Sequence, residues 1–135
     1  MRDRDQRPTF DEREPPVIRT TRIGGLTDGE WAARDVLVPR VLELSVRAGI
    51  APPKVAISSA MARWGSCNSH REVRLAWRLV KAPRELVDYV ICHELAHLRH
   101  MNHSPAFWAE VERQLPGHAA LRKRLFATDH LYRSF

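Results

Sequence analysis

The sequence predicts an α+β fold in which a small antiparallel or mixed sheet packs on one central helix, with further helices on its flanks. Apolar residues recur at helical spacing in three segments, 30–48, 83–100 and 105–115. Two short apolar runs, at 54–60 and 71–80, are instead typical of strands. The apolar content of 44% in 135 residues is enough to build one core.

The chain is expected to divide into an arm and one domain. Residues 1–24 carry alternating charges of both signs, three prolines and few apolar anchors, which is typical of a disordered arm. Thr27 and Glu30 then form a capping box, and this pattern predicts the start of a helix. We therefore expect a single folded domain over residues 25–135.

The expected elements follow in a simple order. The first helix should run to about Ala48, and Pro39 should kink it or split it in two. A strand at 54–60 and a loop at 62–70 come next, and a second strand at 71–80 should lay its apolar face on the central helix. Two shorter helices, separated by Pro116-Gly117, complete the chain.

The central helix carries the residues that indicate chemistry. His93 and His97 are four apart, so a helix projects both rings from nearly one face, where they can bind one metal ion. Glu94 follows His93 and can reach a water on that metal without ligating it. An apolar stripe interrupted by histidines is costly unless they bind something. The pattern predicts a catalytic zinc site with three protein ligands and an activated water.

A third ligand is needed, and two histidines compete for this role. His100 lies on the face of His93, but it sits about 7 Å beyond the metal along a straight helix. The segment Asn102-His103-Ser104-Pro105 favours a break followed by a new helix start, so the chain can fold back and direct His103 at the metal. We favour His103; His100 would then be a last-turn histidine near the helix dipole.

Charge and cysteine content bound the environment of the protein. The segment 54–84 holds seven basic residues and one acid, so it alone accounts for the formal net charge of +6 of the whole chain. This segment predicts either an electropositive rim that contacts nucleotides, nucleic acid or acidic peptides, or an ordinary solvated face. No apolar run is long enough to span a membrane, and two cysteines are too few for a disulfide framework. We expect a cytoplasmic protein with reduced cysteines and no membrane contact.

Several segments in order carry a resemblance to a known family. They are Arg63-Trp64-Gly65-Ser66-Cys67, 75–80, Ala82-Pro83, 86–90, 93–98, 102–104 and Phe107-Trp108. Together they resemble the YgjP-like metallopeptidase family, which belongs to the zincin group and is similar to SprT-like and WLM domains. The resemblance implies a minimal zincin-like metallopeptidase with one zinc ion. His93, His97 and His103 match its ligands, and Glu94 matches its general base.

The chain departs from the family at two points. Ala76 stands where the strand motif often has asparagine, so a polar contact from that position is absent. The part ahead of the core is also short, which bears on the substrates that can be held. The Arg63–Cys67 segment has two interpretations: Arg63 or Ser66 contacts substrate, or Trp64 fills the core, Gly65 makes a turn and Cys67 is a small buried residue.

The predicted reaction is peptide hydrolysis, with Glu94 as the base that deprotonates the water. The strand at 71–80, beside the site, could hold an extended peptide by edge pairing. A further electrophilic donor is expected, and the candidates are Tyr89, Arg99, His130 and Tyr132. Two alternatives remain: a nucleotide phosphohydrolase that uses the same zinc site, and a DNA-associated module whose zinc is structural.

Overall fold

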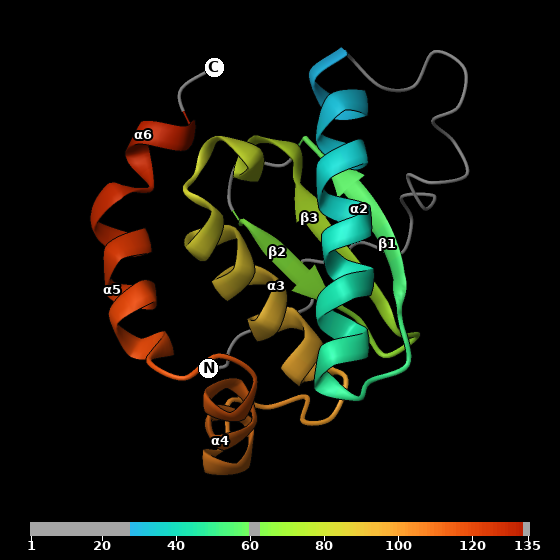
Figure 1. Cartoon of the computed structure of the whole chain (residues 1–135), viewed down its shortest axis with the longest axis vertical. Coiled ribbons are helices and arrows are strands. Elements are labelled where there is room, and N and C mark those ends of the chain that lie inside the picture. Colours follow the sequence, from blue (N-terminus) through green and yellow to red (C-terminus); the bar gives the residue numbers. More distant parts are fainter. Residues whose placement is uncertain (1–27, 60–62, 134–135) are drawn as a thin grey trace.

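The computed structural model describes residues 28–59 and 63–133 (Figure 1). The expected arm at residues 1–24 and the cap residue Thr27 lie outside this part of the chain. The elements are α2 (Asp28–Ala48), β1 (Lys54–Ser58), β2 (Gly65–Cys67), β3 (Glu72–Ala76), the 3-10 helix η1 (Trp77–Lys81), α3 (Arg84–His97), α4 (Pro105–Gln114), α5 (His118–Thr128) and α6 (His130–Arg133).

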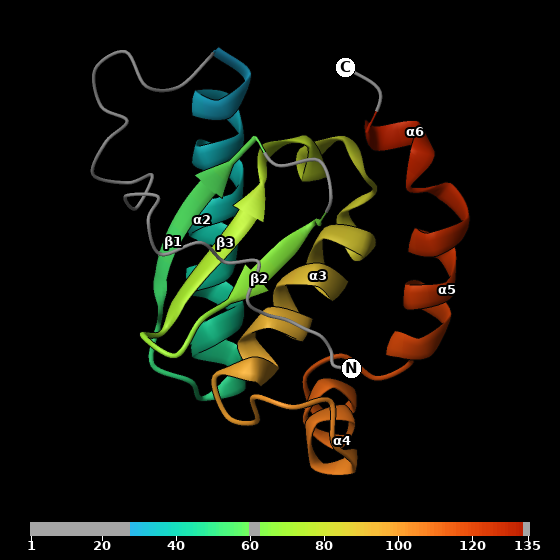
Figure 2. The ribbon, with the colours of Figure 1, turned by 180° about the vertical axis from the view of Figure 1, so that it is seen from behind.

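The sheet is small and mixed, as the sequence predicts. Its strand order is β1-β3-β2, with β1 parallel and β2 antiparallel to β3. Helices α2 and α3 cover the same face of this sheet, while α5 lies on the far side of α3 from α2 (Figures 1 and 2). Helix α4 lies beyond the C-terminal end of α3. The apolar stripe of α3 therefore packs between the sheet and the outer helices.

Only the first part of the second predicted strand, 71–80, is a strand in the structure. β3 ends at Ala76, and the next five residues form η1. Ser58 and Ala76 are the last residues paired between β1 and β3, so the chain beyond Ala76 has no parallel neighbour to bond. Leu79 still reaches the core from η1. Alternating apolar residues thus fit either structure, and the length of the partner strand decides between them.

The predicted loop at 62–70 contains a strand that the sequence analysis missed. Within it, β2 pairs with β3, Gly65 opposite Leu75 and Cys67 opposite Val73. The Asn68 side chain closes the turn that follows, because its oxygen accepts hydrogen bonds from the backbone N–H groups of His70 and Glu72 at 2.9 and 3.1 Å. The polar residues of this segment therefore build a hairpin connection rather than an open loop.

Helix α2 is continuous across Pro39, so of the two outcomes predicted for this proline, a kink or a split, the split does not occur. Its buried apolar residues keep one register on both sides of the proline; they are Ala33, Leu37, Val41, Leu44 and Ala48. Packing of this stripe offsets the hydrogen bond that proline removes. Arg40 also ties α2 to α3 by donating two hydrogen bonds to Asp88, at 2.8 and 2.7 Å.

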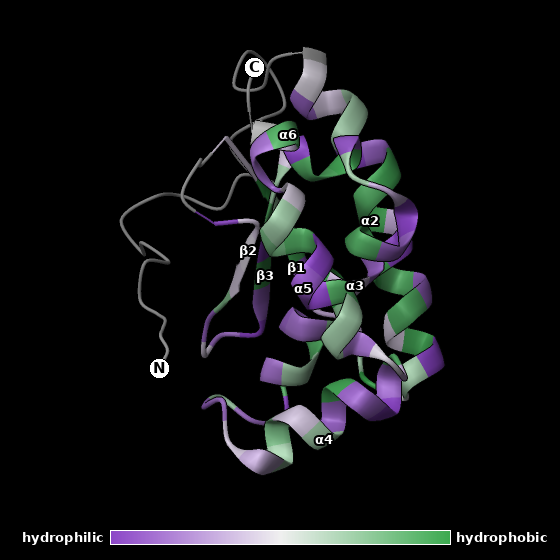
Figure 3. Ribbon diagram, turned by 90° about the vertical axis from the view of Figure 1, so that its left-hand side faces the viewer, coloured by the Kyte–Doolittle hydropathy of each residue, from purple (hydrophilic) through white to green (hydrophobic). Residues whose placement is uncertain are grey.

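The helices that follow α3 begin as the sequence predicts. The Ser104 side chain accepts a hydrogen bond from the backbone N–H of Phe107 at 3.2 Å, and Pro105 is the first residue of α4. Gly117 adopts a φ of 84° just before α5. Hydrophilic and hydrophobic residues are mixed along α2, α4 and α5 (Figure 3). Among the described residues, no helix combines the length and apolar character that a membrane crossing requires.

Candidate metal centre

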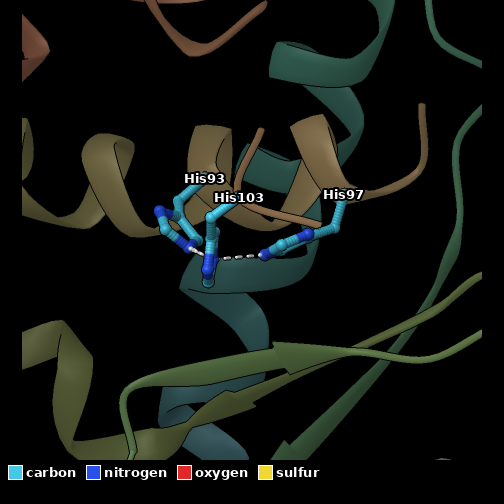
Figure 4. A group of neighbouring side chains, drawn as sticks. All are labelled: His93, His97 and His103. Carbon is cyan, nitrogen blue, oxygen red and sulfur yellow. Dashed lines mark hydrogen bonds between the residues drawn. The ribbon is translucent and has the colours of Figure 1, made fainter. Parts of the chain in front are cut away.

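Three histidines converge at the C-terminal half of α3. His93 and His97 come from successive turns of this helix, and His103 returns from the segment before α4 (Figure 4). The Nε2 atom of His103 lies 3.1 Å from that of His97 and 3.3 Å from that of His93. Among the described residues, these three offer ligand atoms that all lie within 4.8 Å of one another. The structure thus brings together the three residues that the sequence singles out.

The outer nitrogens of two rings have partners that fix their orientation. Nδ1 of His97 lies 3.1 Å from the carbonyl oxygen of His100, so this nitrogen carries the proton and donates it. Nδ1 of His93 lies 3.3 Å from the Tyr89 hydroxyl. With its proton on Nδ1, His97 directs the lone pair of Nε2 toward His103. Such outer contacts are typical of metal-bound histidines.

The site fits a tetrahedral metal. Two nitrogens bound to one zinc at about 2.0–2.1 Å, at a tetrahedral angle, lie about 3.3 Å apart. The measured separations of 3.1 and 3.3 Å match this value. Burial and then the nearness of His97 and His103 hold the pKa of His93 well below its usual value, so its ring stays neutral. Nε2 atoms that converge in this way can bind one cation between them.

His100 takes part through its backbone rather than its ring. Helix α3 ends at His97, and the N–H groups of Arg99 and His100 bond to the carbonyl of Ala96. This tight ending leaves the His100 carbonyl beside His97 and lets the chain turn back to His103. The choice of His103 over His100 therefore follows from the helix end.

Phe107 supports all three rings from α4. It is fully buried, and its ring centroid lies 5.0, 4.4 and 4.9 Å from those of His93, His97 and His103, respectively. In the sequence, Phe107 stands out only as part of a family motif, and the motif itself does not link it to the histidines. Its place three residues after the Ser104 cap was the available signal, because the cap fixes how α4 meets α3.

Glu94 is buried between α3 and β2. Its side chain is 6% exposed, and this burial raises the pKa of its carboxyl to about 8, while the nearby Arg63 acts in the opposite direction. A Cβ atom added to Gly65 would lie 3.1 Å from Glu94 Cγ and 3.2 Å from its Oε2. Gly65 therefore makes room for the carboxylate, and it is a strand residue rather than the predicted turn.

The remaining residues of the Arg63–Cys67 segment divide between the core and the site. Trp64 is buried and its ring meets Tyr132 edge-on, as the structural interpretation predicts. Cys67 is partly buried, and burial together with the charge of Glu94 raises the pKa of its thiol. Arg63 is the residue of this segment whose charge acts on Glu94.

The four candidate electrophiles lie in different places. Tyr89 is buried and contacts His93. Arg99 instead donates a hydrogen bond to the Gly49 carbonyl at 3.0 Å, and Tyr132 packs on Trp64. His130 is exposed on α6. Tyr89 thus meets the cluster, but at the outer nitrogen of His93 rather than at the point where the Nε2 atoms converge.

The basic residues of segment 54–84 are distributed over several elements. Arg74 is buried in the central strand β3. Arg78 and Lys81 lie over the ring of Trp77, at 4.7 and 5.2 Å from its centroid. Within this segment, Arg63 is the basic residue that lies beside Glu94. The proposed contact with nucleic acid or nucleotides remains a prediction.

Known proteins resemble this chain in fold and in sequence. The crystal structure of the metallopeptidase zymogen of Pyrococcus abyssi abylysin is similar, with a TM-score of 0.61 and 28% identity over 73% of this chain and 98% of that one. The zymogen of Methanocaldococcus jannaschii jannalysin shares the fold, with a TM-score of 0.57 and 22% identity over 73% and 96% of the two chains. Curated protein sequences give no significant match. Residues 30–128 match the model of the YgjP-like metallopeptidase domain. The chain therefore belongs to the YgjP-like metallopeptidase family, and its α+β fold is zincin-like.

Proposed function

We propose that this metallopeptidase is a zinc-dependent enzyme that hydrolyses peptide bonds with Glu94 as general base. The observation that carries the proposal is the convergence of three Nε2 atoms at α3, the helix that also carries the buried carboxyl group of Glu94. Three protein ligands leave a fourth position for water, which is typical of catalytic rather than structural zinc sites. His93, His97 and His103 would hold the ion.

The residues of the chain have separate roles in this proposal. Zinc, when bound, supplies a Lewis acid that polarises the scissile carbonyl and lowers the pKa of a water to about 7. Glu94 takes a proton from the attacking water and returns it to the leaving amine. Phe107 and Tyr89 hold the imidazoles in place, and Gly65 leaves the space that Glu94 occupies.

The sheet suggests how an extended peptide would be bound. β3 is the central strand, so the peptide pairing that we expected at 71–80 is not available there. Among the described strands, β2 has a strand neighbour on one side only. Its residue Gly65 lies against Glu94. A peptide added along the outer edge of β2 would therefore pass close to the base, and its backbone would supply most of the hydrogen bonds.

The test is a comparison of substrate classes. Protein freed of metal with a chelator and then reloaded with one equivalent of zinc is incubated with a library of unstructured peptides, with nucleoside triphosphates and with duplex DNA. We expect zinc-dependent peptide cleavage that the chelator abolishes. Release of phosphate without peptide cleavage would instead support the phosphohydrolase. DNA binding without hydrolysis would support a structural zinc module, and either result would refute the peptidase.

A further inference from the structure

An arginine on α5 lies close to the candidate metal centre without belonging to it. The guanidinium carbon of Arg122 is 5.4 Å from the ring centroid of Trp108 and 4.7 Å from that of Phe126. Trp108 in turn lies 5.7 Å from the ring of His93 and 5.7 Å from that of His103. One aromatic side chain therefore separates the guanidinium from two of the proposed ligands.

A second contact, with Tyr89, also places Arg122 near His93. Its guanidinium interacts with the hydroxyl of Tyr89, the residue that contacts Nδ1 of His93. Burial raises the pKa of Tyr89, and the charge of Arg122 opposes this shift. The positive charge also adds to the influences that keep His93 neutral. Arg122 thus projects toward the metal centre from an exposed position on α5.

Arg122 differs from the other arginines nearby in the kind of side chain that it contacts. Arg124, two residues on, pairs with Glu85 at 3.2 Å, and Arg113 pairs with Glu110 at 2.6 Å. Within residues 28–59 and 63–133, the contacts of Arg122 are with aromatic rings and a phenol, and none of them is with a carboxylate. Stacked arginines keep the N–H groups at their edges available, and these groups match a carboxylate in a bidentate geometry.

We propose that Arg122 binds a carboxylate of the peptide substrate near the bond that is cut. This inference rests on the proposed peptidase function and adds a preference for acidic peptides. The carboxylate can come from an aspartate or glutamate side chain or from the C-terminus of a short peptide. The rings of Trp108 and Phe126 hold the guanidinium in place, and its charge selects the anion.

A purely structural role for Arg122 makes a different prediction. In that case the side chain only joins α5 to α4, and its loss would weaken the binding of every peptide equally. The two roles are separated by a ratio of affinities for peptides that differ in one charge. The ratio is independent of how much folded protein each preparation contains.

The experiment uses peptide pairs and a variant that binds without cutting. A peptide cleaved by the zinc-loaded protein is resynthesised with glutamate or glutamine at each position beside the scissile bond, and with a free or amidated C-terminus. Calorimetry then measures the Kd of each pair with zinc-loaded Glu94→Gln, alone and combined with Arg122→Gln. Lys123→Gln, at the exposed neighbouring position on α5, is the matched control.

We expect one acidic peptide to bind about tenfold more tightly than its neutral partner. Arg122→Gln should bring this ratio close to one, whereas Lys123→Gln should leave it unchanged. Which pair shows the effect identifies the source of the carboxylate. Peptide cleavage without any acidic preference, or a preference that survives Arg122→Gln, would overturn this inference alone. Absence of both peptide cleavage and peptide binding would overturn the proposed function with it.

Discussion

Two buried glutamates on neighbouring helices have opposite environments. Glu110 on α4 is 8% exposed, and its carboxylate accepts hydrogen bonds from Arg113 and Gln114. These bonds, with the Arg113 bond as the main cause, hold its pKa below the usual value. Glu94 on α3 is 6% exposed, and burial raises its pKa to about 8, with only the charge of Arg63 opposing the shift.

The difference teaches how a structural carboxylate is distinguished from a reactive one. Arg113 and Arg99, which surround Glu110, donate to the Ala48 and Gly49 carbonyls at the end of α2, at 2.9 and 3.0 Å. Glu110 therefore organises a junction between helices. Within the part of the chain that the structure describes, the charge that acts on Glu94 is that of Arg63. A buried carboxylate without a strong ionic partner can accept a proton near neutral pH.

The largest expected effect is on catalysis. Glu94→Gln should lower kcat/KM for peptides by about 10²–10⁴-fold, because it removes the general base while keeping the side-chain shape. Zinc content, measured by atomic emission, should stay at one per chain. Glu110→Gln should leave kcat/KM per zinc-loaded molecule unchanged. Equal loss of activity in both variants would remove the distinction between the two sites.

The pH dependence of stability should separate the same residues. Between pH 4.5 and about 8, folded metal-free protein keeps the Glu94 proton, whereas the unfolded chain releases it. The folded state then binds more protons, so its free energy of unfolding falls as the pH rises. Relative to Glu94→Gln, the wild type should lose on the order of 4 kcal/mol across this interval. Urea titrations of metal-free protein measure this difference, and a constant difference would contradict the raised pKa.

Glu110→Gln should destabilise the metal-free fold by about 1–3 kcal/mol. Its two arginines are half exposed, so solvent screens part of the lost attraction. Urea unfolding followed by tryptophan fluorescence measures the effect. Asp35→Asn, at an exposed position of α2, provides the control. If both variants unfold at the same urea concentration, the junction at Glu110 contributes no stability.

A smaller effect is expected from Gly65→Ala. The added Cβ would press on Glu94 and on Leu75 Cδ2, at 3.1–3.2 Å, and should displace the carboxylate by a few tenths of an ångström. We expect kcat/KM to fall about tenfold, with zinc affinity retained. Ser66→Ala, the next residue of β2, should retain activity. Full activity in Gly65→Ala would show that the position of Glu94 tolerates this crowding.

The sequence was sufficient where local geometry decides. The four-residue spacing of His93 and His97 fixed their shared face, and the cap and proline at Ser104-Pro105 identified the break that returns His103. The α+β class and the mixed sheet also follow from short apolar runs between helices. For the histidine cluster, the deciding residues lie within about three helical turns of one another.

The sequence was insufficient where distant partners decide. β2 contains only Gly65, Ser66 and Cys67, and it is a strand because β3 offers an edge to pair with. The end of β3 depends on the length of β1. The contact between Trp108 and Arg122 depends on how α5 packs beside α4. None of these contacts has a periodic signal within its own segment.

The central claim is that three imidazoles hold one zinc ion with room for solvent. X-ray absorption at the zinc edge, on wild type loaded with one equivalent, tests it most directly. We predict three nitrogen ligands at about 2.0–2.1 Å and one oxygen, with one nitrogen lost in His103→Ala. A sulfur at about 2.3 Å, a fourth protein ligand, or a spectrum that His103→Ala leaves unchanged would contradict the account.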